Sequence, residues 1–311
     1  MSATKNGDFM KLSEKIADSI GIDAKYIEII ALRNNLYARY YIEKKNGGRR
    51  EILQPSKELK VIQHWLVRNI LNYFPVSKYS YAYSKGNSVR NNAMYHKKSK
   101  YILHTDIVNF FPSITRKMML DYFKNNKRIV DELGINDEDI KLILDICLYK
   151  GNYLVIGGVA SPRIANMIMY DFDIKLKEKL DCMGDFLYTR YADDIIISSY
   201  YYIDENMIEI VKSIMVEYGF EMNRKKTFFM NKKGKRQITG VVIDNNLNKL
   251  TIGNKRYKDF ERMIYRYLVK NEGNIGYIKG YLAYIREINI EQYRQIERIY
   301  KKYDKKKEIF R

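Results

Sequence analysis

The sequence predicts an α+β protein that ends in a basic helical segment. Apolar residues recur at helical spacing near both ends of the chain. Two central segments, 101–111 and 186–200, are instead rich in the β-branched and aromatic residues typical of strands. The last segment, 249–311, holds 17 Lys and Arg against 8 Asp and Glu, a net charge of +9, and carries three successive helical patterns. We therefore expect a mixed body of helices and strands followed by a small helical bundle.

Two helices are predicted to open the chain. The first carries one apolar stripe and ends at Gly21, and the second begins at Asp23 as its N-cap. The stripe consists of Phe9, Leu12, Ile16 and Ile20. The next two runs, 36–45 and 49–55, flank Asn46-Gly47-Gly48, which is a hairpin signal.

The middle of the chain alternates between helical and extended patterns. A long helix is predicted from Ser56 and is closed by Pro75. The remaining expected elements are a strand over 101–111 that ends in a turn at Pro112, helices over 116–149, a loop over 151–158, one helix from Ser161 through Phe172, a strand–turn–strand over 186–200, a helix over 205–218 and one strand over 235–244.

Charge and composition limit the classes of partner and of function that the chain can have. The 311-residue chain has a net charge of +19, which indicates a polyanionic partner, either nucleic acid or an anionic membrane. No apolar run approaches the roughly 20 residues that span a bilayer, so we expect no membrane partner. The two cysteines, Cys147 and Cys182, have unrelated neighbours and fit a reducing cytoplasm. Neither a Walker A loop nor G-x-G-x-x-G occurs.

Three carboxylates form the candidate chemical centre. Asp193 and Asp194 interrupt an apolar strand–turn–strand segment, where uncompensated carboxylates are costly. Asp106 is the acid of the other apolar strand. If that strand lies beside the hairpin, three carboxylates converge, and their hard oxygen ligands suit two Mg²⁺ ions.

Four motifs in order now show a resemblance to the reverse transcriptases. Tyr191-Ala192-Asp193-Asp194 resembles their YxDD motif, and residues 106–111 resemble their first palm motif. The loop from Gly157 to Pro162, with Asn166, resembles the motif that contacts template and nucleotide, and residues 223–227 resemble the lysine motif that follows. The resemblance covers about residues 35–245.

Two further features resemble the retron enzymes within that family. Asn92-Ala93-Met94-Tyr95-His96 matches the NAxxH signature, and Ile238-Thr239-Gly240 is similar to the VTG signature. The resemblance implies a polymerase that copies part of a structured non-coding RNA into single-stranded DNA (msDNA) from an RNA 2′-OH. It also implies antiphage defence with an effector protein encoded nearby.

The resemblance implies a right-hand polymerase architecture. The N-terminal helices and fingers would span 1–100. The palm, an antiparallel sheet with helices, would span 101–245 with a finger insertion at about 116–160, and the thumb would span 246–311. Expected partners are the cognate RNA, the RNA–DNA product and the effector, with higher-order assembly an open question.

The matching also implies residue roles. Asp106, Asp193 and Asp194 would hold two Mg²⁺ ions, with the Ile107 backbone carbonyl as an extra ligand. Lys226 would protonate the leaving pyrophosphate, with Lys225 as the alternative. The expected nucleotide-binding residues are Arg50, Phe111 as a steric gate, Gly157 and Ser161. The expected RNA-binding residues are Asn92, His96, Thr239 and Gly240, with bracing of the fingers as the alternative for Asn92 and His96.

One position departs from the family pattern. The usual Pro-Gln-Gly corresponds here to Val155-Ile156-Gly157, so that Ile156 stands in place of the Gln. This leaves open a divergent defence-associated or group II intron-like reverse transcriptase. A non-catalytic RNA-binding protein is a third alternative, although such a protein has no need of three metal-binding carboxylates. A basic protein of membrane surfaces is a fourth, but the chain lacks the amphipathic basic helix it would need.

Overall fold

The computed structural model describes residues 10–33, 35–44 and 47–310, so Phe9 and Asn46 lie outside the described residues. The chain folds into two compact units, each discontinuous in sequence. The first comprises the chain up to Tyr83 with Ile107–Lys177 and Val211–Met222; the second comprises Ser84–Asp106, Glu178–Ile210 and the chain from Asn223 onward. The finger, palm and thumb boundaries expected from the sequence stay predictions.

The first unit opens with the two predicted helices, α1 (Leu12–Ile20) and α2 (Ala24–Leu32). Gly21 ends α1 with a φ of 72°, a backbone conformation that glycine adopts without strain. The Asp23 side chain accepts a hydrogen bond from the backbone N–H of Tyr26 and so caps α2. Both predicted boundaries are confirmed.

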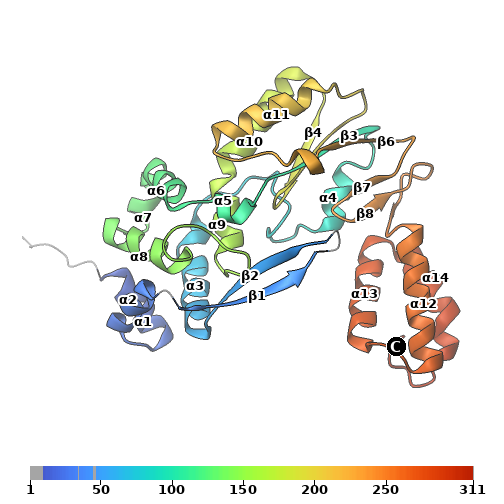
Figure 1. Cartoon of the computed structure of the whole chain (residues 1–311), viewed down its shortest axis with the longest axis horizontal. Helices are drawn as coiled ribbons and strands as arrows, with labels where there is room; N and C mark the ends of the chain where they lie inside the picture. Colours follow the sequence, from blue (N-terminus) through green and yellow to red (C-terminus); the bar gives the residue numbers. More distant parts are fainter. Residues whose placement is uncertain (1–9, 34, 45–46, 311) are drawn as a thin grey trace, which may run out of the picture. The chain divides into compact units, whose positions relative to one another are not determined.

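The predicted hairpin is also confirmed, as the ribbon β1 (Tyr37–Glu43) and β2 (Arg49–Pro55) in Figure 1. The helix that follows, α3 (Lys57–Asn69), is capped by Ser56 but ends well before Pro75. A 3-10 turn, η1 (Leu71–Tyr73), takes its place. The Arg163 guanidinium donates hydrogen bonds to the backbone carbonyls of Leu71 and Phe74, which gives these carbonyls partners outside a helix.

The rest of the first unit is mostly helical. Its helices are α5 (Phe110–Ser113), α6 (Arg116–Asn125), α7 (Lys127–Glu132), α8 (Asp137–Cys147) and α9 (Ser161–Ile168). Helices α10 (Tyr170–Met183) and α11 (Asn206–Glu217) have residues in both units. The expectation of one helix from Ser161 through Phe172 is wrong, because Met169 leaves the helical region with a ψ of 2° and α10 starts afresh.

The loop before α9 is tied to β2. The Leu53 backbone N–H donates to the Ile156 carbonyl at 2.9 Å. At Gly157 the backbone has a φ of +105°, and a Cβ there would lie only 2.8 Å from the Leu53 carbonyl oxygen. Glycine is therefore required for this close approach of loop and strand.

The second unit is built on a four-stranded antiparallel sheet in the order β4-β5-β3-β6 (Figure 1). Its strands are β3 (Tyr101–Asp106), β4 (Leu187–Tyr191), β5 (Asp194–Ser199) and β6 (Phe228–Asn231). The strand–turn–strand over 186–200 is confirmed. The strand expected over 101–111 stops at Asp106 instead, because Asn109 adopts a left-handed φ of 48° and α5 begins at Phe110.

A second, three-stranded sheet corrects another expectation. Residues 235–244 form not one strand but two, β7 (Arg236–Ile238) and β8 (Val241–Ile243), with β9 (Leu250–Thr251) added to β8. Thr239 and Gly240 form the turn with φ values of 45° and 88°. Two successive positive φ values are typical of the tight turn that joins antiparallel strands.

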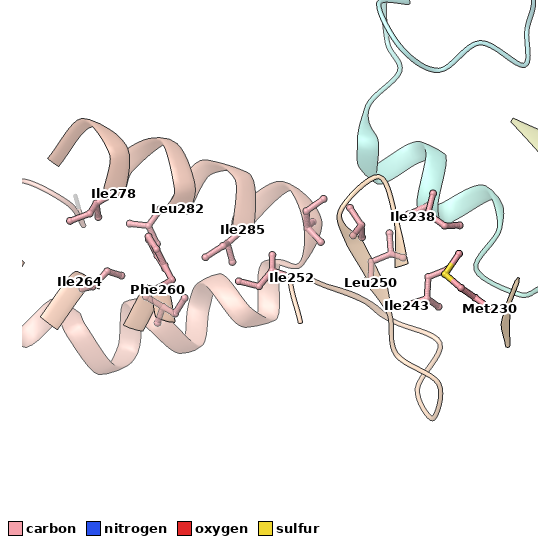
Figure 2. Packing of buried hydrophobic residues seen from close by; sticks show 14 of the residues in the cluster. Met230, Ile238, Ile243, Leu250, Ile252, Phe260, Ile264, Ile278, Leu282 and Ile285 are labelled. Atoms are coloured by element: carbon pink, nitrogen blue, oxygen red, sulfur yellow. The ribbon is translucent and has the colours of Figure 1, made fainter. Parts of the chain in front are cut away.

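The C-terminal bundle is confirmed as three helices, α12 (Asn254–Lys270), α13 (Ile275–Ile288) and α14 (Ile290–Tyr300), followed by the 3-10 turn η3 (Lys301–Tyr303). Figure 2 shows its buried side chains, among them Phe260 and Ile285, in one cluster that continues into the small sheet at Ile243 and Leu250. The short helices α4 (Val89–Tyr95) and η2 (Arg224–Lys226), which were not predicted, complete the second unit.

The contact at Gly157 gives a test of the first unit. We expect Gly157→Ala to lower the free energy of unfolding by about 1–3 kcal/mol, because the new Cβ meets the Leu53 carbonyl and the left-handed backbone strains alanine. Urea unfolding of wild type and variant measures the loss. Gly234→Ala is the matched control, since a Cβ at Gly234 meets nothing within 4 Å. Equal stability of the two variants would contradict the close approach.

Candidate active site

Pairing of β3 with β5 brings the candidate carboxylates together. Asp106 ends β3 and Asp194 begins β5, and the two residues are direct partners in the antiparallel register. Asp193 lies with Ala192 in the turn between β4 and β5. Ala192 has a φ of 57°, and the Arg190 guanidinium donates to its carbonyl at 3.1 Å. A left-handed alanine is strained, so this turn is held by its surroundings.

Asp106 is buried and fully engaged. Its Oδ2 lies 2.6 Å from Lys226 Nζ, and its Oδ1 accepts a hydrogen bond from Asn223 Nδ2 at 3.1 Å. The Asn223 backbone N–H also donates to the Asp106 carbonyl at 2.8 Å. Lys226, from η2, is thus the lysine that the structure pairs with this carboxylate.

The three carboxylates place several negative charges together in a partly buried site. Burial, with the charges of Asp194 and Asp106, raises the pKa of Asp193 to about 6. The pKa of Lys226 is raised, because the Asp106 hydrogen bond and the charges of all three carboxylates outweigh the lowering caused by burial. Both shifts indicate that the three carboxylates lie within electrostatic reach of one another.

His104 belongs to the site although sequence reasoning did not single it out. Its Nε2 lies 3.1 Å from Asp194 Oδ1 and its Nδ1 lies 3.0 Å from the Lys226 backbone carbonyl. Its ring stacks on Phe228 of β6 at 4.9 Å between centroids. The available signal was position, because a residue two before Asp106 in a strand points to the same face.

The donor set fits a divalent cation in its chemistry, since three carboxylates supply hard oxygen ligands around a partly buried site. As they lie, however, no three His, Cys, Asp or Glu side chains among the described residues are arranged as a metal site. The oxygens of Asp106 contact Lys226 and Asn223, and Asp194 contacts His104. The expected adjacency of strand and hairpin is confirmed, and the metal ligation stays a prediction.

The expected nucleotide-binding residues all lie in the first unit. Arg50 is exposed on β2, and Phe111 is half-buried in α5 with its ring 6.4 Å from that of Tyr83. Gly157 lies against β2 as described above. Ser161 is almost fully buried at the start of α9, with no hydrogen-bond partner for its hydroxyl in the part of the chain that is described. Its expected part in nucleotide binding stays a prediction.

Ile107 follows Asp106 directly and is buried, forming an isolated β-bridge with Met222. Its proposed role concerns the backbone carbonyl alone, so the burial of its side chain neither supports nor opposes that role.

Asn92 and His96 are fully buried, which differs from the expected RNA contact. His96 Nε2 lies 2.7 Å from Thr189 Oγ1 and Nδ1 lies 2.6 Å from Ser198 Oγ. Thr189 Oγ1 in turn donates to Asn92 Oδ1 at 2.5 Å. The Thr189 hydroxyl has one proton, which it donates to Asn92 Oδ1. It therefore accepts a hydrogen bond from the N–H at His96 Nε2, while His96 Nδ1 accepts one from the Ser198 hydroxyl. The ring is thus neutral. His96 thus bridges β4 and β5, and Asn92 is joined to β4 through Thr189.

Thr239 and Gly240 occupy the β7–β8 turn. Asn92 Nδ2 donates to Thr239 Oγ1 at 3.4 Å, and Arg256 Nη1 of α12 donates to the Gly240 carbonyl at 2.7 Å. Both turn residues line a hollow of about 730 Å³ that also reaches Asp194. The hollow's remaining lining residues are Val89, His104, Tyr191, Phe228, Phe229, Met230, Lys235 and Gln237. The turn and one candidate carboxylate therefore share one cavity.

No helix among the described residues has the length and apolarity needed to cross a bilayer.

Comparison with known proteins adds independent findings. Residues 42–243 match the family model described as "Reverse transcriptase (RNA-dependent DNA polymerase)". The chain is 33% identical to the retron Ec86 reverse transcriptase of Escherichia coli, over 86% of this chain and 83% of that protein. It is 32% identical to the retron Ec73 reverse transcriptase of Escherichia coli, over 84% and 86%. Among solved structures, telomerase from Candida albicans with a telomeric RNA fragment aligns at a TM-score of 0.47 and 12% identity, over 94% of this chain and 58% of that one.

Burial of His96 predicts a pH-dependent stability. Burial lowers its pKa to about 3, while the unfolded chain binds the proton near pH 6.5. The unfolded state thus holds more protons between these values, so the stability conferred by His96 falls as pH falls. Between pH 7 and pH 5 we expect the stability difference between wild type and His96→Gln to shrink by about 2 kcal/mol.

Urea unfolding at both pH values measures this difference, and the same change at the exposed His64 is the control. A difference that does not depend on pH would contradict the neutral, buried ring.

Proposed function

Because the chain belongs to the reverse transcriptase family, as a retron-type RNA-directed DNA polymerase, we propose that it copies part of a structured non-coding RNA into single-stranded msDNA from an RNA 2′-OH. Membership carries with it the right-hand polymerase fold, and the mixture of helices and antiparallel sheet agrees with that fold. The observation that carries the proposal is the pairing of Asp106 with Asp194, beside Asp193, on neighbouring strands.

We propose that the three carboxylates, with the Ile107 backbone carbonyl, hold two Mg²⁺ ions. When bound, the ions supply charge that activates the attacking hydroxyl and stabilises the leaving pyrophosphate. The support is the donor chemistry, together with the electrostatic crowding at Asp193. A bound cation would offset the mutual repulsion of the three carboxylates.

Lys226 is proposed to donate a proton to the leaving pyrophosphate. Its ammonium contacts Asp106 while more than half of its side chain is exposed, so it can reach both the carboxylate and a ligand in solvent. The neighbouring Lys225 remains the alternative.

The first unit is proposed to bind the incoming nucleotide. Arg50 would grip the triphosphate as a bidentate donor from the exposed strand β2. Phe111 would exclude a ribose 2′-OH, and its packing against Tyr83 and Phe110 supports a ring held in one place. Gly157 would set the distance between β2 and the loop, and the buried Ser161 would act through the backbone at the start of α9.

Among the retron-signature residues, we propose RNA contact only for those in the β7–β8 turn. Thr239 and Gly240 line the hollow that contains Asp194, and this location supports contact with the priming strand. The net charge of +19 supports a structured RNA partner. For Asn92 and His96 we now propose bracing of the strands β4 and β5 instead.

The cellular setting is proposed from family resemblance. We propose action in the cytoplasm, in antiphage defence, with an effector protein and a higher-order assembly as partners. Two free cysteines fit a reducing compartment. Ile156 in place of the usual Gln keeps a divergent defence-associated or intron-like enzyme as the alternative, and identification of the RNA bound in cells distinguishes the two.

Primer extension tests the polymerase and its carboxylates together. With Mg²⁺, dNTPs and an RNA template, we expect wild type to make DNA and Asp193→Asn to lose at least about a thousandfold in rate, because a lost metal ligand removes several kcal/mol of transition-state stabilisation. RNA affinity should stay unchanged.

Asp121→Asn makes the same chemical change on the exposed surface of α6 and serves as the control. DNA synthesis by Asp193→Asn at the wild-type rate would show that the metal site is wrongly assigned. If neither wild type nor Asp193→Asn makes DNA when the cognate RNA is present, the result would favour the non-catalytic RNA-binding protein.

Phe111 makes a separate prediction about sugar selection. In Phe111→Ala we expect ribonucleotide incorporation relative to deoxynucleotide incorporation to rise about tenfold or more, because the bulk opposing the 2′-OH is gone. Single-nucleotide kcat/KM values for dNTP and rNTP measure the ratio. Phe111→Tyr keeps the bulk and should keep the selectivity. An unchanged ratio in the alanine variant would exclude the steric gate.

A further inference from the structure

Three consecutive tyrosines, Tyr200, Tyr201 and Tyr202, are exposed directly after β5, with 54%, 68% and 67% of their surface accessible. Strand β5 begins at Asp194 and ends at Ser199. Five residue steps along a strand span about 17 Å, so the tyrosines lie at the end of the sheet opposite the carboxylates. They therefore play no part in the active site described above.

The rings are exposed but not loosely held. The Tyr202 ring meets that of Tyr101, the first residue of β3, edge to face at 5.6 Å, and the Tyr200 and Tyr201 rings lie 5.7 Å apart. The Tyr201 backbone N–H donates to Ser199 Oγ at 3.1 Å, and Ser199 Oγ donates to the Asp185 carbonyl at 2.9 Å. Rings fixed in this way lose little freedom when a ligand stacks on them.

Two lysines lie close to the tyrosines. Lys100 Nζ lies 3.7 Å from the centre of the Tyr200 ring. A hydrogen bond and the charge of Lys100, and then the charge of Lys232, lower the pKa of Tyr200, so both lysines are within electrostatic reach of it. Lys232 directly follows Asn231, which pairs with Tyr101 across β3 and β6. Charge and aromatic rings are thus gathered at one end of the sheet.

Buried Arg236 joins the two lysine-bearing segments. Its Nη1 donates to the backbone carbonyls of Lys97 at 3.3 Å and Ser99 at 2.5 Å, while Arg236 itself directly follows the segment 232–235. Together the two segments contribute Lys97, Lys98, Lys100, Lys232 and Lys233, whereas Lys235 lines the hollow that reaches Asp194. We call the three tyrosines with these five lysines the tyrosine–lysine surface.

We propose that the tyrosine–lysine surface binds single-stranded RNA, with unpaired bases stacked on Tyr201 and Tyr202 and phosphates beside the lysines. Stacking needs bases that are not already paired, and exposed rings next to cations are the usual means of holding a single strand. The positive charge of the lysines attracts the phosphates of a nucleic acid, and the exposed rings offer faces on which its bases stack. The proposal deepens the proposed function, because it assigns a second contact with the RNA, away from the catalytic carboxylates.

The test uses the full chain with its site for primer and template occupied. The protein is first saturated with an unlabelled primer–template duplex, and a fluorescein-labelled 12-nucleotide single-stranded RNA is then titrated by anisotropy at two salt concentrations. We expect the labelled strand to bind, and the double variant Tyr201→Ala/Tyr202→Ala to bind it about tenfold or more weakly. Tyr201→Phe/Tyr202→Phe keeps the rings and should bind within about twofold of wild type.

Tyr73→Ala, another exposed tyrosine, is the matched control and should change nothing. Primer extension by the same preparations reports the polymerase separately, and it should be equal in all variants. The proposal is overturned if the labelled RNA does not bind the saturated protein, or if both double variants weaken binding equally. It is also overturned if DNA of the same sequence binds more tightly, or if the alanine variant binds RNA as wild type does.

Discussion

The antiparallel pairing of β3 with β5 is the constraint on which the candidate site depends. It makes Asp106 and Asp194 direct neighbours, with Asp193 beside them, although three carboxylates repel one another. Burial of Ile195, Ile196 and Ile197 in β5 is what opposes this repulsion, since each side chain is fully removed from water. Lys226 of η2 supplies a counter-charge at Asp106, and His104 of β3 itself contacts Asp194.

Local pattern predicted the parts of this arrangement that depend on local physics. The run 186–200 is rich in β-branched and aromatic residues around two acids, so its strand–turn–strand form could be predicted directly. Gly21 and Asp23 marked helix boundaries because each supplies a specific cap that acts within a few residues. The carboxylates were found for the same reason, as acids are conspicuous in apolar strands.

What the sequence could not predict depends on distant partners or on strained backbone. Residues 235–244 look like one strand because Thr239, a β-branched residue, seldom adopts the φ of 45° that the turn requires. The partner of His104 lies 90 positions further along the chain, so its contact follows only from the register of β3 and β5. Burial of Asn92 and His96 likewise depends on where α4 packs, which no local pattern specifies.

The buried network around His96 joins β4 and β5, the two strands on either side of the turn that holds Asp193. Thr189 of β4 and Ser198 of β5 both bond to the ring of His96, and Thr189 also bonds to Asn92. A one-residue slip of β4 against β5 would turn the Thr189 hydroxyl to the other face of the sheet, away from the ring, and leave buried polar atoms unpaired. Asp194 begins β5, and a slip of that strand against β3 would move it out of its pairing with Asp106. We therefore propose that the signature residues act on the carboxylates indirectly, by stabilising the pairing of β4 with β5, the strand that begins at Asp194.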